Sequence, residues 1–250
     1  MSLFSYEQIK GLNPGEFRVY NFVASHMDTV HEMNIRQLAG AVGVSTTTVL
    51  RFCEKSGCSG YTELKYRLRQ AAAAQNKGGN FDAVPAVQYI NCTAKDPAFA
   101  DKLAQAAEIF ANADLVILSG DGESGALIRY GVYLFHSIGK AAFLAEQGYG
   151  TACPSGKIRT AALLLSSQGD SEGILSVMNI YKRAGAALVS ITNGEQCPAA
   201  QISDINFSCC MPEVSRSFGD RHTELASQIP VVYLLERLAA ELQKFQKENI

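Results

Sequence analysis

The stretch NIRQLAGAVGVSTTTVLRFCEKSGCSGYTELKYRLRQ, residues 34–70, decides the fold of the N-terminal part of this chain. Apolar residues recur at helical spacing from Ile35 to Val42, so this segment should form a short helix with one apolar face. Gly43 then permits a tight turn, and Ser45 is a suitable N-cap for a second helix over residues 46–56. Together with the helical segment that ends the stretch, the pattern predicts three short helices joined by two tight turns.

The second of these helices leaves hydroxyl and cationic side chains on its exposed face. Val49, Phe52 and Cys53 fall together on the apolar face. Small hydroxyl side chains at a helix N-terminus allow close approach to a phosphate, and an arginine about one turn further on can reach a base edge. The alternative interpretation is an ordinary solvated helix face. The candidate DNA contacts are Ser45, Thr46, Thr47, Thr48, Arg51, Lys55 and Lys65.

The charges of the chain are unevenly distributed. Residues 36–69 carry six Lys and Arg against two Glu, which is a local excess of four positive charges. Residues 1–77 carry nine basic and six acidic side chains, whereas the remainder carries thirteen and eighteen, so the net charges are +3 and −5. A basic N-terminal part on an acidic remainder is typical of a nucleic-acid-binding module joined to a second domain.

The composition excludes several classes of protein. A length of 250 residues, with 47% hydrophobic and 18% charged residues, fits one or two globular domains rather than a disordered chain. Seven cysteines without a CxxC pair predict reduced thiols and no metal site. No segment approaches the roughly 20 apolar residues of a membrane span, and the N-terminus lacks the basic and apolar regions of a signal peptide. We therefore expect a cytoplasmic protein that holds no metal or cofactor.

After Asp114 short apolar segments alternate with helical ones. The expected strands cover residues 115–118, 141–144, 161–165, 187–191 and 204–208, with helices at 126–138 and 171–184 and a long closing helix at 223–246. Short apolar strands that alternate with helices predict a five-stranded parallel sheet flanked by helices, a three-layer, Rossmann-like α/β fold.

The expected domain boundaries follow from this change of pattern. Residues 1–77 should form an all-α DNA-binding domain of the helix-turn-helix type. Gly78-Gly79 interrupt the last helical segment, so we expect a linker over residues 78–95. Asp96-Pro97 is a helix start, and the α/β domain is predicted over residues 96–250.

The loop after the first expected strand contains glycines at a dinucleotide-binding spacing. Gly120, Gly122 and Gly125 read as GxGxxG between a strand and a helix. Glu146 stands about where the acid that binds a ribose hydroxyl would lie. A dinucleotide site is therefore one interpretation, and glycines that serve only a tight turn are another.

A second loop, Ser166-Ser167-Gln168-Gly169-Asp170-Ser171, follows the third expected strand. Hydroxyls and free amides at the start of a helix form a cradle for an anion without a cation. In a parallel sheet, ligands bind at the edge where the strands end. A dinucleotide fold has no need of a second phosphate loop here, so the two loops together favour a small phosphorylated ligand.

Two sets of motifs resemble known families. The pattern SxxTVxRFxxKxGxxGYxELK, from Ser45 to Lys65, resembles the N-terminal DNA-binding domain of RpiR-type transcriptional regulators. GxGxS at Gly120–Ser124 and SxxGxS at Ser166–Ser171 resemble the sugar isomerase (SIS) domain, which binds phosphosugars. In RpiR-type regulators this domain is the effector-sensing half, so the two resemblances together cover about the whole chain.

The resemblance implies that three serines hold the phosphate of a sugar while two glycines allow its close approach to the backbone. Gln168 stands where the family usually has a second serine, and Ser171 stands where it usually has threonine. Three nearby carboxylates, those of Asp121, Glu123 and Asp170, would repel a phosphate at close range. The candidate ligand residues are Gly122, Ser124, Ser166, Gln168, Gly169, Ser171 and Glu224.

Glu224 also bears on whether the second domain is an enzyme. Isomerisation of an aldose to a ketose needs a base near the substrate carbon. Glu224, expected in the first turn of the closing helix, and the nearby His222 are the candidate pair. A glutamate in that position is more often a residue that complements the helix dipole.

The resemblance thus implies a transcriptional regulator and not an enzyme. Its expected partners are double-stranded DNA and a sugar phosphate effector, and a homodimer or homotetramer is expected to form through the second domain. A sugar-phosphate isomerase or a dinucleotide-binding enzyme built on the same α/β domain is the alternative.

Overall fold

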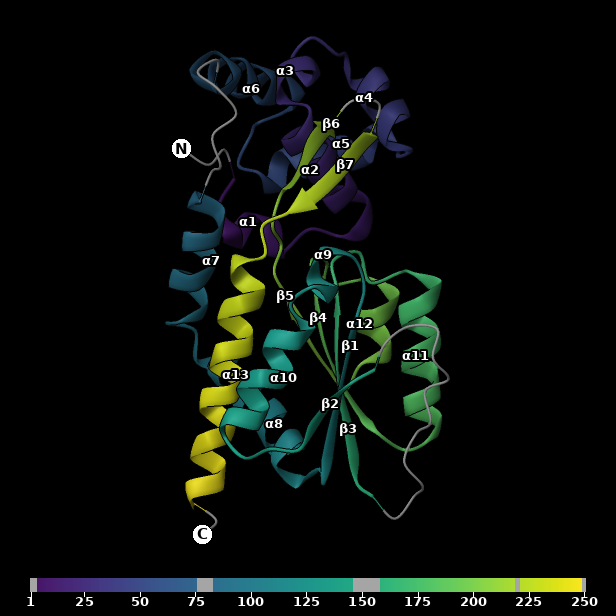
Figure 1. The fold of residues 1–250 in the computed structure, drawn as a ribbon. Coiled ribbons are helices and arrows are strands. Elements are labelled where there is room, and N and C mark those ends of the chain that lie inside the picture. The colour runs from purple at the N-terminus through teal and green to yellow at the C-terminus, as the bar shows by residue number, and fades with distance from the viewer. Residues whose placement is uncertain (1–3, 76–82, 146–157, 219–220, 249–250) are drawn as a thin grey trace. The chain divides into compact units, whose positions relative to one another are not determined.

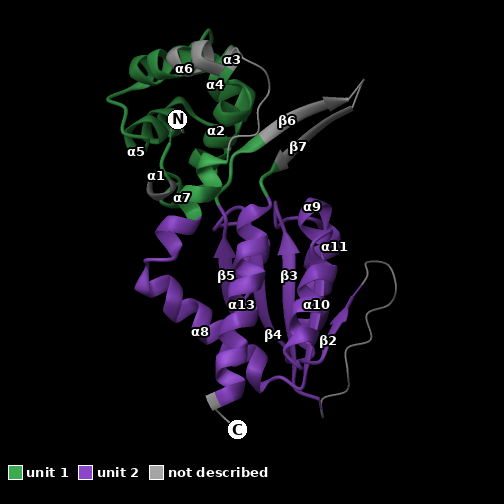
Figure 2. Cartoon of the chain, turned by 60° about the vertical axis from the view of Figure 1, so that its left-hand side comes forward, with its two compact units in different colours: residues 1–89, 210–227 green, residues 90–209, 228–250 purple. Residues whose placement is uncertain are grey.

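The computed structural model describes residues 4–75, 83–145, 158–218 and 221–248. The chain forms two compact units (Figure 2). Unit 1 comprises Met1–Tyr89 and Cys210–Ser227, and unit 2 comprises Ile90–Cys209 and Gln228–Ile250. No helix of the described ranges is long and apolar enough to cross a membrane.

Unit 1 begins with a series of six helices. They are α1 (Tyr6–Lys10), α2 (Pro14–Ser25), α3 (Met27–Val30), α4 (Ile35–Val42), α5 (Thr46–Lys55) and α6 (Tyr61–Gln75). The three helices predicted between residues 34 and 70 are therefore confirmed as α4, α5 and α6. Gly43 joins α4 to α5 in the left-handed conformation, with φ +71°, which glycine adopts without a side-chain penalty.

Apolar packing holds α5 in place within this unit. Val49 and Phe52 of α5 are buried together with Val23 of α2 and Leu38 of α4. The Ser45 hydroxyl accepts the N–H of Thr48 at 3.1 Å, so the predicted N-cap of α5 is present. The burial of one face leaves the opposite face of α5 toward solvent.

An antiparallel hairpin completes unit 1, and the sequence did not predict it. Strand β6 (Glu213–Phe218) pairs with β7 (Arg221–Ala226), and the Ser25 hydroxyl of α2 donates to the Glu213 carbonyl at 2.6 Å. The prediction of a helix from residue 223 was wrong at its start, because the closing helix α13 spans Ile229–Glu248. Glu, Leu and Ala favour helices locally, but pairing with the preceding strand β6 overrides that preference.

The unit boundaries also differ from the expected domains. Helix α7 (Val84–Thr93) occupies most of the predicted linker, whose residues 78–82 lie outside the described ranges. The division between the units falls within α7, after Tyr89, and the hairpin segment Cys210–Ser227 belongs to unit 1. A boundary inside a helix leaves no composition signal, which is why the sequence placed it elsewhere.

Unit 2 contains the predicted five-stranded parallel sheet. Its strands are β1 (Leu115–Gly120), β2 (Ala142–Leu144), β3 (Thr160–Ser166), β4 (Ala187–Thr192) and β5 (Ile205–Ser208). All four pairings are parallel, and the order is β2-β1-β3-β4-β5. The order reverses between β1 and β3, and ligands of such sheets bind at the strand ends beside this reversal.

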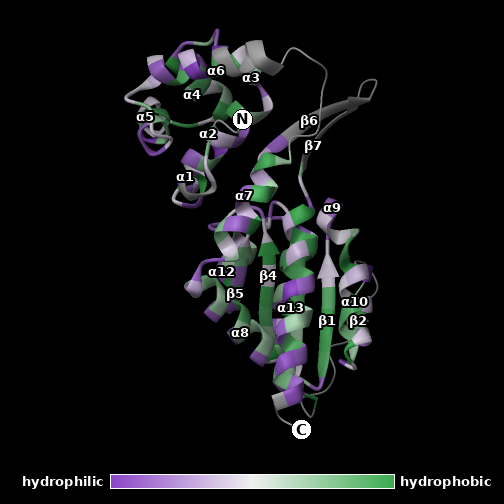
Figure 3. Ribbon diagram, turned by 90° about the vertical axis from the view of Figure 1, so that its left-hand side faces the viewer, coloured by the Kyte–Doolittle hydropathy of each residue, from purple (hydrophilic) through white to green (hydrophobic). Residues whose placement is uncertain are grey.

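Helices cover both faces of the sheet, as Figure 1 shows. One face carries α8 (Pro97–Asn112), α10 (Ile128–Ser137) and α13, and the other carries α11 (Glu172–Arg183) and α12 (Pro198–Ile202). On the α11 face, Ala162 and Leu164 of β3 pack with Ile174 and Met178 in one buried cluster. Double coverage explains the nearly continuous apolar sequence of the strands, which Figure 3 shows as hydrophobic at the centre of the unit.

Candidate functional site

The exposed face of α5 carries part of the predicted DNA-binding set. Thr47 and Arg51 are exposed and lie one helical turn apart, while Thr46 and Thr48 are half-buried. The exposed Ser45 lies 2.9 Å from Thr48 through their hydroxyl oxygens. The helix therefore presents a hydroxyl-bearing N-terminus followed by a cation, which suits contact with a phosphate backbone and a base edge.

Lys55, another predicted DNA contact, is engaged within unit 1. Its Nζ atom lies 2.7 Å from Glu16 Oε2 and donates to the Gly11 carbonyl at 2.8 Å. The Glu16 side chain is only 1% exposed and also accepts the N–H of Asn13 at 2.9 Å. Lys55 thus neutralises a buried carboxylate and fixes the end of α5 to the α1–α2 connection. This role could not be predicted from local sequence because the partner lies 39 residues away.

Lys65, the last of the predicted DNA contacts, lies on α6 and is half-buried. Near it, Glu63 accepts the N–H and the hydroxyl of Ser59, both at 2.7 Å, and pairs with Arg67. These hydrogen bonds, first those from Ser59 and then that from Arg67, lower the pKa of Glu63 from 4.5 to about 2. The start of α6 is thereby held by a carboxylate that stays ionised.

In unit 2, the loops after β1 and β3 meet through serine hydroxyls. The Oγ atoms of Ser124 and Ser167 are 2.8 Å apart, and the Ser124 hydroxyl also donates to Gln228 Oε1 at 3.0 Å. Ser124 is 2% exposed, and it lies on the short helix α9 (Gly122–Gly125). The two loops therefore meet, and the serine that faces Ser124 is Ser167, which the family pattern did not single out.

Ser166 and Gly169 shape their own loop. The Ser166 hydroxyl, only 3% exposed, accepts the N–H of Gly169 at 3.0 Å. Gly169 has φ +68°, and a Cβ atom there would lie 2.4 Å from the Sγ atom of Cys197. Glycine is required at this position by the conformation and by the close approach of Cys197. Both residues therefore stabilise the conformation of their own loop.

Ser171 caps the helix that follows the second loop. Its Oγ atom accepts the N–H of Ile174 at 3.2 Å, and its hydroxyl donates to Asp121 Oδ2. Gln168 is exposed in the same loop, and Gly122 has φ +56° at the start of α9. The cap and the link to Asp121 together join the two loops a second time.

Two carboxylates accept hydrogen bonds from hydroxyls at the place where the sequence suggested repulsion of a phosphate. Asp121 accepts from Ser171, and Glu123 Oε1 accepts from the Ser167 hydroxyl at 3.1 Å. The hydroxyls of the two loops therefore already donate hydrogen bonds to negatively charged groups. An incoming anion would compete with these side chains for the same protons.

The glycines of the GxGxxG pattern are explained by backbone packing. A Cβ atom at Gly120 would lie 2.6 Å from the Leu165 carbonyl oxygen, and one at Gly125 would lie 2.9 Å from the carbonyl carbon of Gly120. The first and last glycines therefore let α9 pack against the end of β1. Glu146, the proposed ribose-binding acid, lies outside the described ranges.

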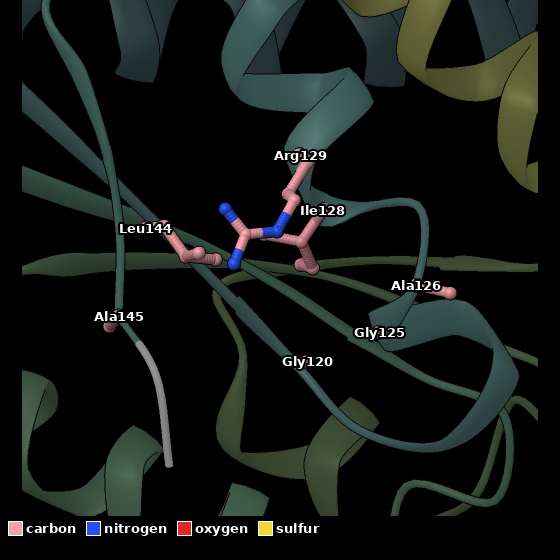
Figure 4. A pocket seen from close by; sticks show the side chains of 7 residues that line it. All are labelled: Gly120, Gly125, Ala126, Ile128, Arg129, Leu144 and Ala145. Carbon is pink, nitrogen blue, oxygen red and sulfur yellow. The ribbon is translucent and has the colours of Figure 1, made fainter. Parts of the chain in front are cut away.

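A cavity of about 290 Å³ lies beside this glycine loop, at the ends of β1 and β2 (Figure 4). Arg129 is the one charged residue among the residues found to line it, and its guanidinium extends between Ile128 and Leu144. The lining is otherwise small or apolar: Gly120, Gly125, Ala126, Ile128, Leu144 and Ala145. The sequence did not single out Arg129, because only the fold brings the start of α10 beside the end of β2.

The prediction for Glu224 needs correction. Glu224 lies on β7 of unit 1, where it pairs in register with Ser215, and not in the first turn of a helix. His222 lies on the same strand, opposite Ser217. The argument for an isomerase base at the start of the closing helix therefore loses its structural premise.

Comparisons with known proteins agree with these two halves. Residues 6–75 match the profile of the helix-turn-helix domain, rpiR family. An uncharacterized HTH-type transcriptional regulator of Caldanaerobacter subterraneus subsp. tengcongensis is 27% identical over 250 residues, which covers 94% of this chain and 88% of that protein.

Two solved structures share the fold. The NanR protein of Vibrio vulnificus has a TM-score of 0.53 and 21% identity, over 96% of this chain and 90% of its own. The sugar isomerase domain of an RpiR transcription factor from Sphaerobacter thermophilus has a TM-score of 0.51 and 18% identity, over 67% of this chain and 93% of its own. Residues 6–75 therefore belong to the rpiR family of helix-turn-helix domains, and the chain as a whole is similar to HTH-type transcriptional regulators and shares the fold of the two solved structures.

Proposed function

We propose that this regulator binds double-stranded DNA through α5 and that a phosphorylated sugar, bound at the ends of β1 and β3, controls this binding. The observation that carries the second half is the 2.8 Å contact between Ser124 and Ser167, which joins hydroxyls from two loops at the strand-order reversal. The Vibrio vulnificus NanR protein, whose fold resembles this one, is complexed with ManNAc-6P.

For the DNA, the exposed Thr47 and Arg51 are the candidate contacts from the centre of α5, and Ser45 and the backbone amides beside it suit a phosphate. Because a helix-turn-helix reads a half-site, two copies are needed for a symmetric operator, and we propose a homodimer or homotetramer. This role places the protein with the chromosome, in the cytoplasm.

For the ligand, the hydroxyls of Ser124, Ser167 and Ser171 are the candidate donors to the phosphate. They now donate to Gln228, Glu123 and Asp121, so the phosphate has to replace intramolecular acceptors. The adjacent cavity of about 290 Å³ has room for a sugar, and Arg129 on its wall provides a cation for an anionic group.

The experiment begins with selection of genomic DNA fragments that the full-length protein retains. A panel of hexose 6-phosphates and pentose 5-phosphates, with ManNAc-6P among them, is then tested for a rise in melting temperature and for a change in affinity for the selected fragment. At least one member should do both. Ser124→Ala should abolish the thermal shift, because the buried hydroxyl pair is lost, whereas the exposed Ser176→Ala on α11 should retain it.

Two outcomes contradict the proposal. Retention of no fragment removes the DNA-binding half, and a thermal shift by NAD in place of the sugar phosphates favours the dinucleotide alternative. We propose sensing without turnover, since Glu224 is not at the start of the closing helix. Conversion of an aldose phosphate to a ketose phosphate by the purified protein, abolished by Glu224→Gln, would reverse this.

A further inference from the structure

The Ser124 hydroxyl is shared between the ligand loops and the start of α13. Its Oγ atom lies 3.0 Å from Gln228 Oε1 and 2.8 Å from Ser167 Oγ, and Ser167 Oγ lies 3.1 Å from Glu123 Oε1. Four side chains therefore form one continuous row of hydrogen-bonding groups. The row begins at a carboxylate of the first loop and ends at Gln228.

The number of protons limits which of these contacts exist at one time. A serine hydroxyl carries a single proton, so Ser124 can donate fully to one acceptor only. In this structure the acceptor is the side-chain carbonyl of Gln228. An anion that accepts a hydrogen bond from Ser124 therefore replaces Gln228 as the acceptor. The two contacts exclude each other.

Gln228 occupies a particular place in the chain. The segment Cys210–Ser227 belongs to unit 1, and Gln228 is the first residue of the chain after it returns to unit 2. The backbone carbonyl of Gln228 accepts the N–H of Val232 at 3.1 Å in the first turn of α13. At the other end of this segment, the Glu213 carbonyl accepts the hydroxyl of Ser25 on α2, within the helix-turn-helix unit.

We propose that Gln228 is the positioning residue that couples occupancy of the ligand site to the DNA-binding unit. Donation from Ser124 to an anion breaks its contact with the Gln228 side chain, and this changes how the start of α13, where the hairpin segment rejoins unit 2, is held. The inference rests on the proposed function, because it needs an anion at Ser124. It adds the residue through which that anion acts.

The coupling is measured as the factor by which the panel member with the largest thermal shift changes affinity for the selected DNA fragment. In the native full-length protein this factor differs from one, in either direction. Gln228→Met keeps the length of the side chain but has no carbonyl acceptor, so the factor should fall to within twofold of one. Gln105→Met, at an exposed position on α8, should leave the factor unchanged.

A second readout separates positioning from structural damage. Without the competing Gln228 carbonyl, the Ser124 proton is available to the ligand, so Gln228→Met should bind the same sugar phosphate roughly three- to tenfold more tightly. Damage to the fold would weaken ligand binding instead. Gln228→Ala, which removes the same acceptor, should reproduce both effects, and it serves as the test if the methionine variant does not fold.

Each remaining outcome has a defined meaning. A coupling factor that survives in both Gln228 variants overturns the inference while the proposed function stands. Weaker ligand binding by both variants makes Gln228 a ligand contact or a structural residue, which also overturns it. If no panel member shifts the melting temperature of the native protein, the proposed function fails first, and the inference fails with it.

Discussion

Lys55 shows how a residue with the right chemistry and position for DNA takes a structural role. Its ammonium group lies 2.7 Å from Glu16 Oε2, and the Glu16 side chain is 1% exposed. A buried carboxylate that loses its cation is left uncompensated, which destabilises a protein more than the intact pair stabilises it. The ammonium group of Lys55 is therefore required for the stability of unit 1, which limits its availability to DNA.

Replacement of Lys55 by methionine should lower the free energy of unfolding by roughly 2 kcal/mol. This is less than the cost of breaking a fully buried ion pair, because the Lys55 side chain is partly exposed. The measurement is urea unfolding at pH 7, with Lys95→Met at an exposed site as the control. Adding Glu16→Gln to Lys55→Met should recover part of the loss. If Lys55→Met instead leaves stability unchanged and reduces the salt dependence of DNA binding by about one unit of slope, Lys55 is a phosphate contact.

Among the elements, capped helix starts were well predicted from local sequence, whereas the start of α13 and the last strand pair were not. Ser45 and Asp96 cap α5 and α8, as the sequence predicted. Caps depend on groups within three residues, so sequence reveals them. The pairing of β6 with β7 depends on a partner segment, and the helix-favouring residues at the end of β7 concealed it.

The Glu63 carboxylate gives the start of α6 a pH dependence with a definite sign. Its pKa is lowered to about 2 in the folded protein from 4.5, so its contribution is fully present above pH 4.5 and is lost as the pH falls toward 2. Glu63→Gln should lower the urea midpoint at pH 7, and the difference from the native protein should shrink at pH 3. The exposed Glu108→Gln on α8 is the control. A difference that is the same at both pH values would argue against an ionised Glu63 as the cause.

At the scale of the whole molecule, the chain passes between its two units three times. The crossings follow Tyr89, Cys209 and Ser227. This connectivity differs from a head, a linker and a body in sequence, because residues far along the chain complete the N-terminal unit. Unit 1 therefore contains a segment bounded on both sides by unit 2, so the two units are joined covalently at three points.

DNA binding by the whole regulator should depend on Arg51 more than on its other exposed arginines. Arg51→Gln should weaken binding to the selected fragment by roughly 10- to 100-fold, as expected for the loss of a base or phosphate contact. The melting temperature should not change, because Arg51 is exposed. Arg183→Gln, on α11 of unit 2, is the matched control. Equal affinities of the two variants, measured at one salt concentration, would remove α5 as the recognition helix.

Sequence alone determined the local and periodic features of this protein. The three helices between residues 34 and 75, the five parallel strands and the loops with their glycines and serines follow from spacing, capping and apolar pattern, which act over a few residues. The wording of the first motif also agrees with the rpiR-family helix-turn-helix model that residues 6–75 match. These features are visible in the sequence because spacing, caps and apolar pattern are local signals, even where the strands themselves pair with distant partners.

Which side chains meet follows from the fold and not from the local pattern. The fold paired Lys55 with Glu16, joined Ser124 to Ser167 and Gln228, placed Arg129 on the cavity wall and put Glu224 on a strand of unit 1. The contacts of Lys55 and of Ser124 join residues between 39 and 104 positions apart, and a one-dimensional pattern carries no information on such pairings. The roles of the candidate site residues depend on these contacts, because a hydroxyl or a charge acts through whichever partner the fold brings to it.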